Sequence, residues 1–192
     1  MFEPQDLPGR FGHVVKAVDA VLQAISCEAV VGGGWAVWRH GYLGRVTQDL
    51  DIGLPENRIE EFLRAAAVSG FDVLTRLPGR WPRLQHRDSG LEVDILPEGG
   101  RPGTATRPAP TTIPHPSELG AEGHQLRYMR LASLIELKLA AGRARDESDV
   151  VELVRANRDQ VDYLRTHLAS VHADYLVAFN HLVQRAEEQG ED

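Results

Sequence analysis

Three aspartates have the types and spacing that could do chemistry. Asp49 and Asp51 stand two residues apart in the segment QDLDIGL, and Asp94 stands in the later segment LEVDIL. Side chains alternate along a strand, so Asp49 and Asp51 would share one face, and a neighbouring strand would bring Asp94 to them. Three uncompensated carboxylates repel one another, so the cluster predicts bound cations. Oxygen ligands without His or Cys favour Mg²⁺ or Mn²⁺.

A glycine turn precedes the aspartate pair. Gly32, Gly33 and Gly34 directly follow the short apolar run at 28–31. Where a strand passes into a helix, bare backbone amides suit phosphate oxygens, and two metal ions can hold the attacking and leaving oxygens of a phosphoryl transfer. A glycine triplet also occurs in ordinary turns, and Asp-x-Asp occurs on exposed strands. The order and spacing of the features together predict one phosphate site.

The elements that must position these residues follow from hydrophobic periodicity. A helical pattern covers 10–26, and a strand at 28–31 and a short helix at 35–40 follow. Alternation predicts a strand over 48–54, a helix follows over 55–69, and further strands are expected over 71–75, around 83–86 and over 91–96. The segment 97–116 is rich in Pro and Gly and predicts a long connector or lid. After it the pattern is helical throughout, around 131–139, over 148–155 and twice more between 159 and 188.

These elements predict two domains, a sheet domain over 1–116 that includes the connector and a helical domain over 117–192. The chain has 192 residues, of which 42% are hydrophobic and 26% charged. This composition excludes a disordered chain. The sequence predicts no membrane span and no secretory signal, and its single cysteine is consistent with a reducing compartment. We therefore expect a cytoplasmic protein.

The net charge of −7 argues against a general nucleic-acid coat, which needs clustered positive charge. One stretch, 73–87, nevertheless contains no acid. It holds several arginines with aromatic residues between them: Arg76, Arg80, Trp81, Arg83, His86 and Arg87. Two interpretations stay open, a solvated strand edge or a surface that faces phosphate.

The segment VVGGGWAVWRHGYLGRVTQDLDIGL resembles the signature of the nucleotidyltransferase superfamily typified by DNA polymerase beta. Gly33 and Gly34 take the glycine positions, Asp49 and Asp51 form the pair, and Asp94 is the third carboxylate. Trp35 departs from the pattern, since many members have serine near the turn. The resemblance implies an α/β (α+β) fold, with a small mixed β-sheet core flanked by helices and followed by a C-terminal helical bundle.

A finer resemblance concerns toxins of the AbiEii-like and MenT-like branch. It rests on Arg45-x-Thr47-x-Asp49 and on the segment RLASLIELKLAAGRARDESDVVELV. The resemblance implies that Lys138 contacts the nucleotide triphosphate, with Arg45 and Thr47 as further nucleotide-binding residues. From the residues alone, Lys138 could instead extend to solvent. Asp146 and Asp149 could be site residues or favourable charges at a helix N-terminus.

The resemblance implies a metal-dependent enzyme that moves a nucleoside monophosphate from an NTP, such as ATP, to an acceptor hydroxyl. Asp49 and Asp51 would bind both metals, and Asp94 would hold the catalytic metal and help to deprotonate the hydroxyl. The toxin branch implies a tRNA 3′ end as acceptor and a cognate antitoxin as partner. One alternative is an antibiotic O-nucleotidyltransferase of the lincosamide or aminoglycoside kind, whose cationic substrates suit an acidic protein. The other is a non-catalytic binding protein of the same fold.

Overall fold

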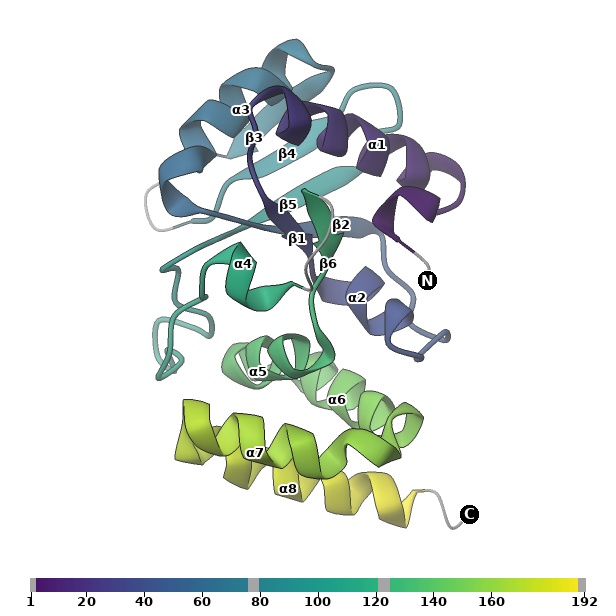
Figure 1. The fold of residues 1–192 in the computed structure, drawn as a ribbon, viewed down its shortest axis with the longest axis vertical. Helices are drawn as coiled ribbons and strands as arrows, with labels where there is room; N and C mark the ends of the chain where they lie inside the picture. Colours follow the sequence, from purple (N-terminus) through teal and green to yellow (C-terminus); the bar gives the residue numbers. More distant parts are fainter. Residues whose placement is uncertain (1–2, 76–79, 121–124, 190–192) are drawn as a thin grey trace.

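A computed structural model describes residues 3–75, 80–120 and 125–189 (Figure 1). Within them, six strands form one mixed sheet in the order β3-β4-β5-β2-β1-β6. β2 is parallel to β5, β1 is parallel to β6, and the other neighbouring strands are antiparallel. The strands are β1 (Ala29–Val31), β2 (Asp49–Leu54), β3 (Phe71–Thr75), β4 (Arg83–His86), β5 (Glu92–Pro97) and β6 (Leu126–Tyr128).

Eight α-helices lie in the same described residues. They are α1 (Gly9–Ala24), α2 (Gly33–Arg39), α3 (Ile59–Val68), α4 (Pro116–Leu119), α5 (Leu131–Ala141), α6 (Ala144–Ala156), α7 (Val161–Val171) and α8 (Ala173–Glu188). Three short 3₁₀ turns occur at Pro4–Asp6, Glu56–Arg58 and Arg158–Gln160. The expected fold class, a mixed sheet with flanking and C-terminal helices, is confirmed.

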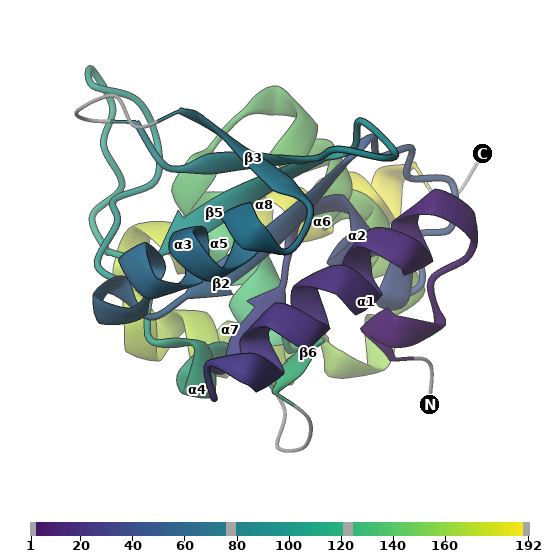
Figure 2. The same cartoon turned by 90° about the horizontal axis from the view of Figure 1, so that it is seen from above.

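The helices form layers on the two sides of the sheet. Figures 1 and 2 show α1 and α3 together on one side, with α2 and the stacked helices α5 to α8 on the other. Within the stack, α8 packs against α5, α6 and α7. Helix α5 buries residues on every face, including the polar side chains of Glu136 and Lys138. A charged side chain on a helix that is buried on every face needs a partner of opposite charge or a hydrogen bond. The charged groups of α5 must therefore be paired inside the helical layer.

The central strands follow the alternation seen in the sequence. In β2, Leu50 and Ile52 are fully buried, whereas Asp49 and Asp51 alternate with them and are only partly buried. β5 runs beside it in parallel, with Asp94 directly opposite Asp51. This register brings the third aspartate to the first two.

One expectation is wrong. The chain after residue 116 is not helical throughout, because β6 pairs in parallel with β1 at the edge of the sheet. The strand is three residues long, too short to show an alternating pattern in the sequence. The proposed domain boundary near 116 stays a prediction, although the sheet draws its last strand from beyond it.

The connector is a folded loop. Between β5 and α4 it has no regular element except an isolated bridge from Gly103 to Pro108. Backbone hydrogen bonds nevertheless close it on itself, from the amide of Gly99 to the carbonyl of Ile113 and from the amide of Ala109 to the carbonyl of Pro102. Both views show it at one edge of the molecule, and in Figure 1 it lies at the level between the sheet and α5. It can therefore contribute a fixed wall to a neighbouring cavity.

Among the described residues, no helix combines the length and the apolar character that crossing a membrane would require.

Candidate active site

A cavity of about 250 Å³ lies where the sheet faces α5 and α6. We call it the carboxylate cavity. The sheet and the glycine turn contribute the three aspartates and two glycines, and α5 and α6 contribute cations. The predicted site residues that line it are Gly33, Gly34, Arg45, Asp49, Asp51, Asp94 and Lys138. Thr47 is the one predicted site residue that does not line it.

The glycines let the turn approach the aspartates closely. Gly33 has a φ of +53°, and a Cβ atom there would lie 1.7 Å from Oδ2 of Asp51. A Cβ atom on Gly34 would lie 2.6 Å from Oγ1 of Thr47. Glycine at these positions is thus already required by packing against Asp51 of β2 and against Thr47 in the loop before it. Any contact of the turn with phosphate comes in addition to this structural need.

Asp51 is the most perturbed carboxylate of the site. Burial raises its pKa to about 7, and the charges of Asp49 and Asp94 act in the same direction. The charges of Lys138 and Arg143 oppose the rise without cancelling it. The cations of the protein therefore do not offset the cost of a charge at Asp51, as expected of a carboxylate arranged to receive a bound cation.

Asp94 is held by an arginine on the neighbouring strand β4. Nε of Arg83 lies 2.5 Å from Oδ1 of Asp94, and Nη1 of Arg83 lies 3.0 Å from Oε2 of Glu92. Burial raises the pKa of Asp94, the hydrogen bond and charge of Arg83 lower it, and the net direction is upward. In the sequence Arg83 stands out only as part of a basic stretch, since its pairing with Asp94 depends on the register of β4 against β5.

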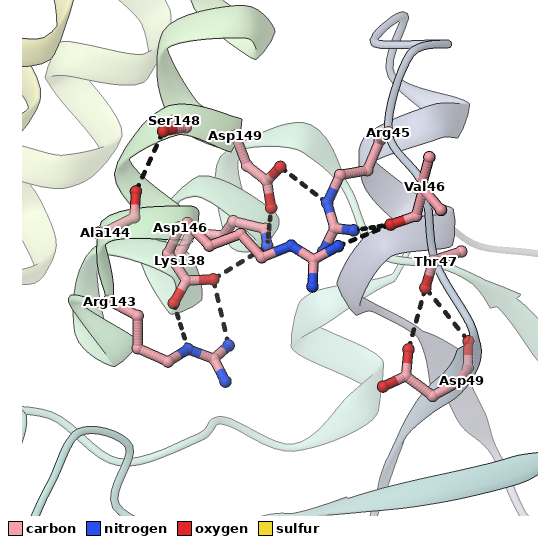
Figure 3. A network of polar contacts seen from close by, with 11 residues as sticks. Arg45, Val46, Thr47, Asp49, Lys138, Arg143, Ala144, Asp146, Ser148 and Asp149 are labelled. Carbon is pink, nitrogen blue, oxygen red and sulfur yellow. Dashed lines mark hydrogen bonds and ion pairs between the residues drawn. The ribbon is translucent and has the colours of Figure 1, made fainter.

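A buried ionic network joins α5, α6 and the loop before β2 (Figure 3). Nζ of Lys138 donates to Oδ2 of Asp149 at 2.6 Å and to Oδ1 of Asp146 at 3.1 Å. Arg45 donates from Nε to the other oxygen of Asp149 at 2.8 Å, and Arg143 donates from Nε to Asp146 at 2.6 Å. Asp149 thus ties the loop to the helices.

This network decides two questions that the sequence left open. Lys138 is only 6% exposed and does not extend to solvent. Asp146 and Asp149 are each 2% exposed and are partners of the buried lysine. Burial alone would raise the pKa of Asp146, but the hydrogen bond from Arg143 and the charges of Lys138 and Arg143 lower it overall. Lys138 therefore reaches the cavity with its ammonium group already oriented by two carboxylates.

Two further arginines that sequence analysis did not select line the same cavity. Arg143 lies between α5 and α6 and stays largely exposed while it pairs with Asp146. Arg145 donates from Nη2 to the carbonyl of Val46 at 2.7 Å. The run Arg143-x-Arg145 after the lysine was the available signal. It falls at the start of α6, from where Arg145 contacts the loop before β2 and Arg143 contacts Asp146.

Thr47 contacts the site indirectly. Its Oγ1 donates to Oδ1 of Asp49 at 3.0 Å, which orients that carboxylate at the start of β2. Trp35 packs edge-on against Phe11 and Trp38, with ring centroids 4.6 Å and 5.9 Å apart, so it belongs to the packed interior beside α1.

The basic stretch at 73–87 divides into separate parts. Arg87 pairs with Asp72 and donates to the carbonyls of Ala67 and Phe71, so it serves the turn around β3. Arg76 lies outside the described residues. Arg80 and Trp81, by contrast, line a cavity beside the carboxylates.

The three aspartates partly fit the expected metal. Within the described residues, no three His, Cys, Asp or Glu side chains are grouped closely enough to hold one ion as they stand. Asp94 is turned to Arg83, whereas Asp49 and Asp51 share a face and Asp51 lacks a charge partner among the described ion pairs. The donor set of carboxylate oxygens and the raised pKa of Asp51 fit a hard divalent cation at Asp49 and Asp51.

Comparison with known proteins adds the family context. The family model described as aminoglycoside-2″-adenylyltransferase matches residues 14–105, a little under half of the chain. The crystal structure of ANT(2″)-Ia in complex with adenylyl-2″-tobramycin superposes with a TM-score of 0.51 at 18% identity, covering 90% of this chain and 97% of that one. The protein has a nucleotidyltransferase-type fold.

Two more structures are similar over most of the chain. The solution structure of the antibiotic-resistance factor ANT(2″)-Ia has a TM-score of 0.50 at 18% identity, over 93% of this chain and 94% of that one. An antigenic nucleotidyltransferase-like protein from Paracoccidioides brasiliensis has a TM-score of 0.47 at 14% identity, over 88% and 91%. Among curated proteins, none matches the sequence.

Proposed function

We propose that the protein transfers a nucleoside monophosphate from an NTP to an acceptor hydroxyl, with a divalent metal ion. The observation that carries the proposal is the carboxylate cavity, in which three aspartates meet a cluster of cations from the helical layer. Carboxylates suit the metal, and the cations suit the phosphates. The family model and the fold support the same reaction class.

The reaction exchanges one bond at the α-phosphorus for another. The acceptor oxygen bonds to the α-phosphorus, the bond to the β-phosphate oxygen breaks, and pyrophosphate leaves with that electron pair. Asp94 accepts the hydroxyl proton, a role that its upward-shifted pKa favours. Asp49 and Asp51 would hold the divalent ion, Mg²⁺ or Mn²⁺, which supplies positive charge to the transferring phosphoryl group.

The cations have complementary tasks. Lys138 and Arg143 lie close enough to lower the pKa of Asp51, so they also act on a phosphate placed beside that carboxylate. Arg45 is fixed by Asp149 and lines the cavity from the side of the loop, together with the glycine turn. We assign these residues to the triphosphate, with Thr47 as the residue that orients Asp49.

The comparisons and the sequence point to different acceptors. The family model and its structural relatives favour a small-molecule hydroxyl, because the family is described as aminoglycoside-2″-adenylyltransferase and the superposed ANT(2″)-Ia structure is a complex with adenylyl-2″-tobramycin. A tRNA 3′ end and a cognate antitoxin rest on the sequence resemblance to toxins alone. A non-catalytic binding role is disfavoured because the three carboxylates are all present beside the cations.

A transfer assay tests the proposal. The protein is incubated with each α-labelled NTP, Mg²⁺ or Mn²⁺, and separate acceptors: total tRNA, lincosamides, aminoglycosides and phosphorylated sugars. We expect metal-dependent release of pyrophosphate and label on one acceptor class, and we expect Asp49→Asn and Asp51→Asn to abolish both. Arg64→Gln, on the far helix α3, is the control. Nucleotide binding without any transfer would favour the non-catalytic role.

A further inference from the structure

A second cavity adjoins the first on the side of β5. It has a volume of about 430 Å³, and we call it the arginine cavity. It shares Asp51, Asp94 and Trp81 with the carboxylate cavity but is not lined by the glycine turn. Asp94 is proposed to take the proton from the attacking hydroxyl. The substrate that carries this hydroxyl would therefore approach through this cavity.

The arginine cavity has an excess of positive charge. Four guanidinium groups line it, against the two carboxylates of the site: Arg80, Arg83, Arg101 and Arg143 against Asp51 and Asp94. Arg83 is paired with Asp94 and Glu92, and Arg143 is paired with Asp146, so the positive charge left over comes from Arg80 and Arg101. In the part of the chain that the structure describes, neither Arg80 nor Arg101 forms an ion pair, so two guanidinium groups face the cavity without a carboxylate partner.

The two guanidinium groups without a carboxylate partner come from different segments that meet at the cavity. Arg80 directly precedes Trp81, just before β4, and Arg101 lies in the folded connector. Nη1 of Arg101 donates to the carbonyl of Ala109 at 2.7 Å, so the arginine is anchored while its other N–H groups remain for a ligand. Trp81 is 36% exposed and offers an aromatic surface beside them.

This charge is the wrong sign for a polycationic acceptor and the right sign for an anionic one. A metal ion bound at Asp49 and Asp51 would neutralise acidic charge and make the excess larger. Arginine binds phosphate through paired N–H groups of matching geometry. Two such groups beside the reacting carboxylate would hold a phosphate of the acceptor near its attacking hydroxyl.

We propose that the acceptor is a hydroxyl compound that carries phosphate, bound through Arg80 and Arg101 in the arginine cavity. This inference rests on the proposed nucleotidyl transfer and names the chemical class of its second substrate. The phosphate could belong to a free phosphorylated sugar or to the end of a nucleic-acid strand. Both kinds of compound carry a phosphate group, a monoester dianion or a diester, close to the hydroxyl that attacks.

Titration calorimetry tests the inference on the full chain saturated with Mg²⁺ and a non-hydrolysable NTP analogue. The charged probes are ribose 5-phosphate and an RNA trinucleotide, and their uncharged counterparts are ribose and the methylphosphonate trinucleotide. We expect one charged probe to bind at least about tenfold more tightly than its counterpart, as charge-assisted hydrogen bonds would give. The probe that binds identifies the source of the phosphate.

Variants separate the pocket from general electrostatics. Arg80→Gln with Arg101→Gln should weaken the charged probe at least about tenfold and leave the NTP analogue unchanged. Arg64→Gln removes the same kind of charge from exposed α3 and should change neither. Equal binding of charged and uncharged probes, binding of neither, or wild-type affinity in the double variant would overturn the inference alone. Failure of the NTP analogue to bind would overturn the proposed function as well.

Discussion

Asp51 and Gly33 show how closely the residues of the site depend on one another. A Cβ atom at Gly33 would lie against the carboxylate of Asp51, and that carboxylate has a pKa raised to about 7 by burial and by Asp49 and Asp94. The sequence revealed the residue types and the shared face of Asp49 and Asp51. It could not reveal that Arg83 holds Asp94, because that pair depends on how β4 lies against β5.

The raised pKa of Asp51 predicts a pH-dependent cost to folding. The folded pKa of about 7 lies above the unfolded value, so the folded state binds the proton more tightly and loses stability as pH rises from about 4 through 7. In EDTA at pH 8, Asp51→Asn should raise the thermal midpoint by about 2–4 °C or more, since 1 kcal/mol gives such a shift in a chain of this size.

The same variant supplies its own control at low pH. Near pH 4 the wild-type carboxyl is protonated in the folded state, so the advantage of Asp51→Asn should largely disappear. Thermal unfolding of both proteins at the two pH values measures the difference. A midpoint that falls on substitution at pH 8 would mean that Asp51 is a stabilising structural charge.

A pair of glycine substitutions tests the close approach of the turn. Gly33 and Gly9 have similar φ angles, +53° and +59°, but a Cβ atom at Gly9 meets nothing within 4 Å. Gly9→Ala should cost about 1 kcal/mol for the backbone alone. Gly33→Ala should lower the free energy of unfolding clearly more, because the added Cβ atom also displaces the carboxylate of Asp51. Denaturant unfolding compares the two, and equal losses would remove the packing explanation for Gly33.

At the scale of elements, the parallel pair β2 and β5 and the helices α5 and α6 position the site. Periodicity in the sequence predicted most helices and strands, because their apolar faces are long enough to show a period. It missed β6, whose three residues form a strand only because β1 offers its edge. It also could not reveal that Lys138 is buried between Asp146 and Asp149, since that depends on how α6 packs against α5.

The buried network predicts that the two lysines of the chain contribute very differently to the free energy of unfolding. Lys138→Met would leave Asp146 and Asp149 buried with one cation fewer, so we expect a loss of about 3–5 kcal/mol in the free energy of unfolding. Lys16→Met, on the exposed side of α1, should stay within about 0.5 kcal/mol of the wild type. Chemical denaturation measures both. Similar small effects would show that the network contributes little to stability.

At the scale of the whole molecule, the site exists only where the sheet and the helical layer meet. The carboxylates belong to β2 and β5, and the cations facing them come from α5, the start of α6 and the loop before β2. The connector between the two parts forms a further wall through Arg101 and Pro102. The sequence indicated the sheet and the helices separately. The cavity between them depends on how the sheet packs against the helices, and the hydrophobic pattern of either part alone does not show this.

The central claim is that this junction binds a metal ion and a nucleotide together. The most direct measurement is titration calorimetry of a non-hydrolysable ATP analogue, and of the other NTP analogues in turn, with Mg²⁺ and with EDTA. The account predicts that at least one analogue binds to the wild type in Mg²⁺, and that EDTA or Asp51→Asn weakens this binding at least about tenfold. An absence of binding for all analogues, or binding that is equal with Mg²⁺, with EDTA and in the variant, would contradict it.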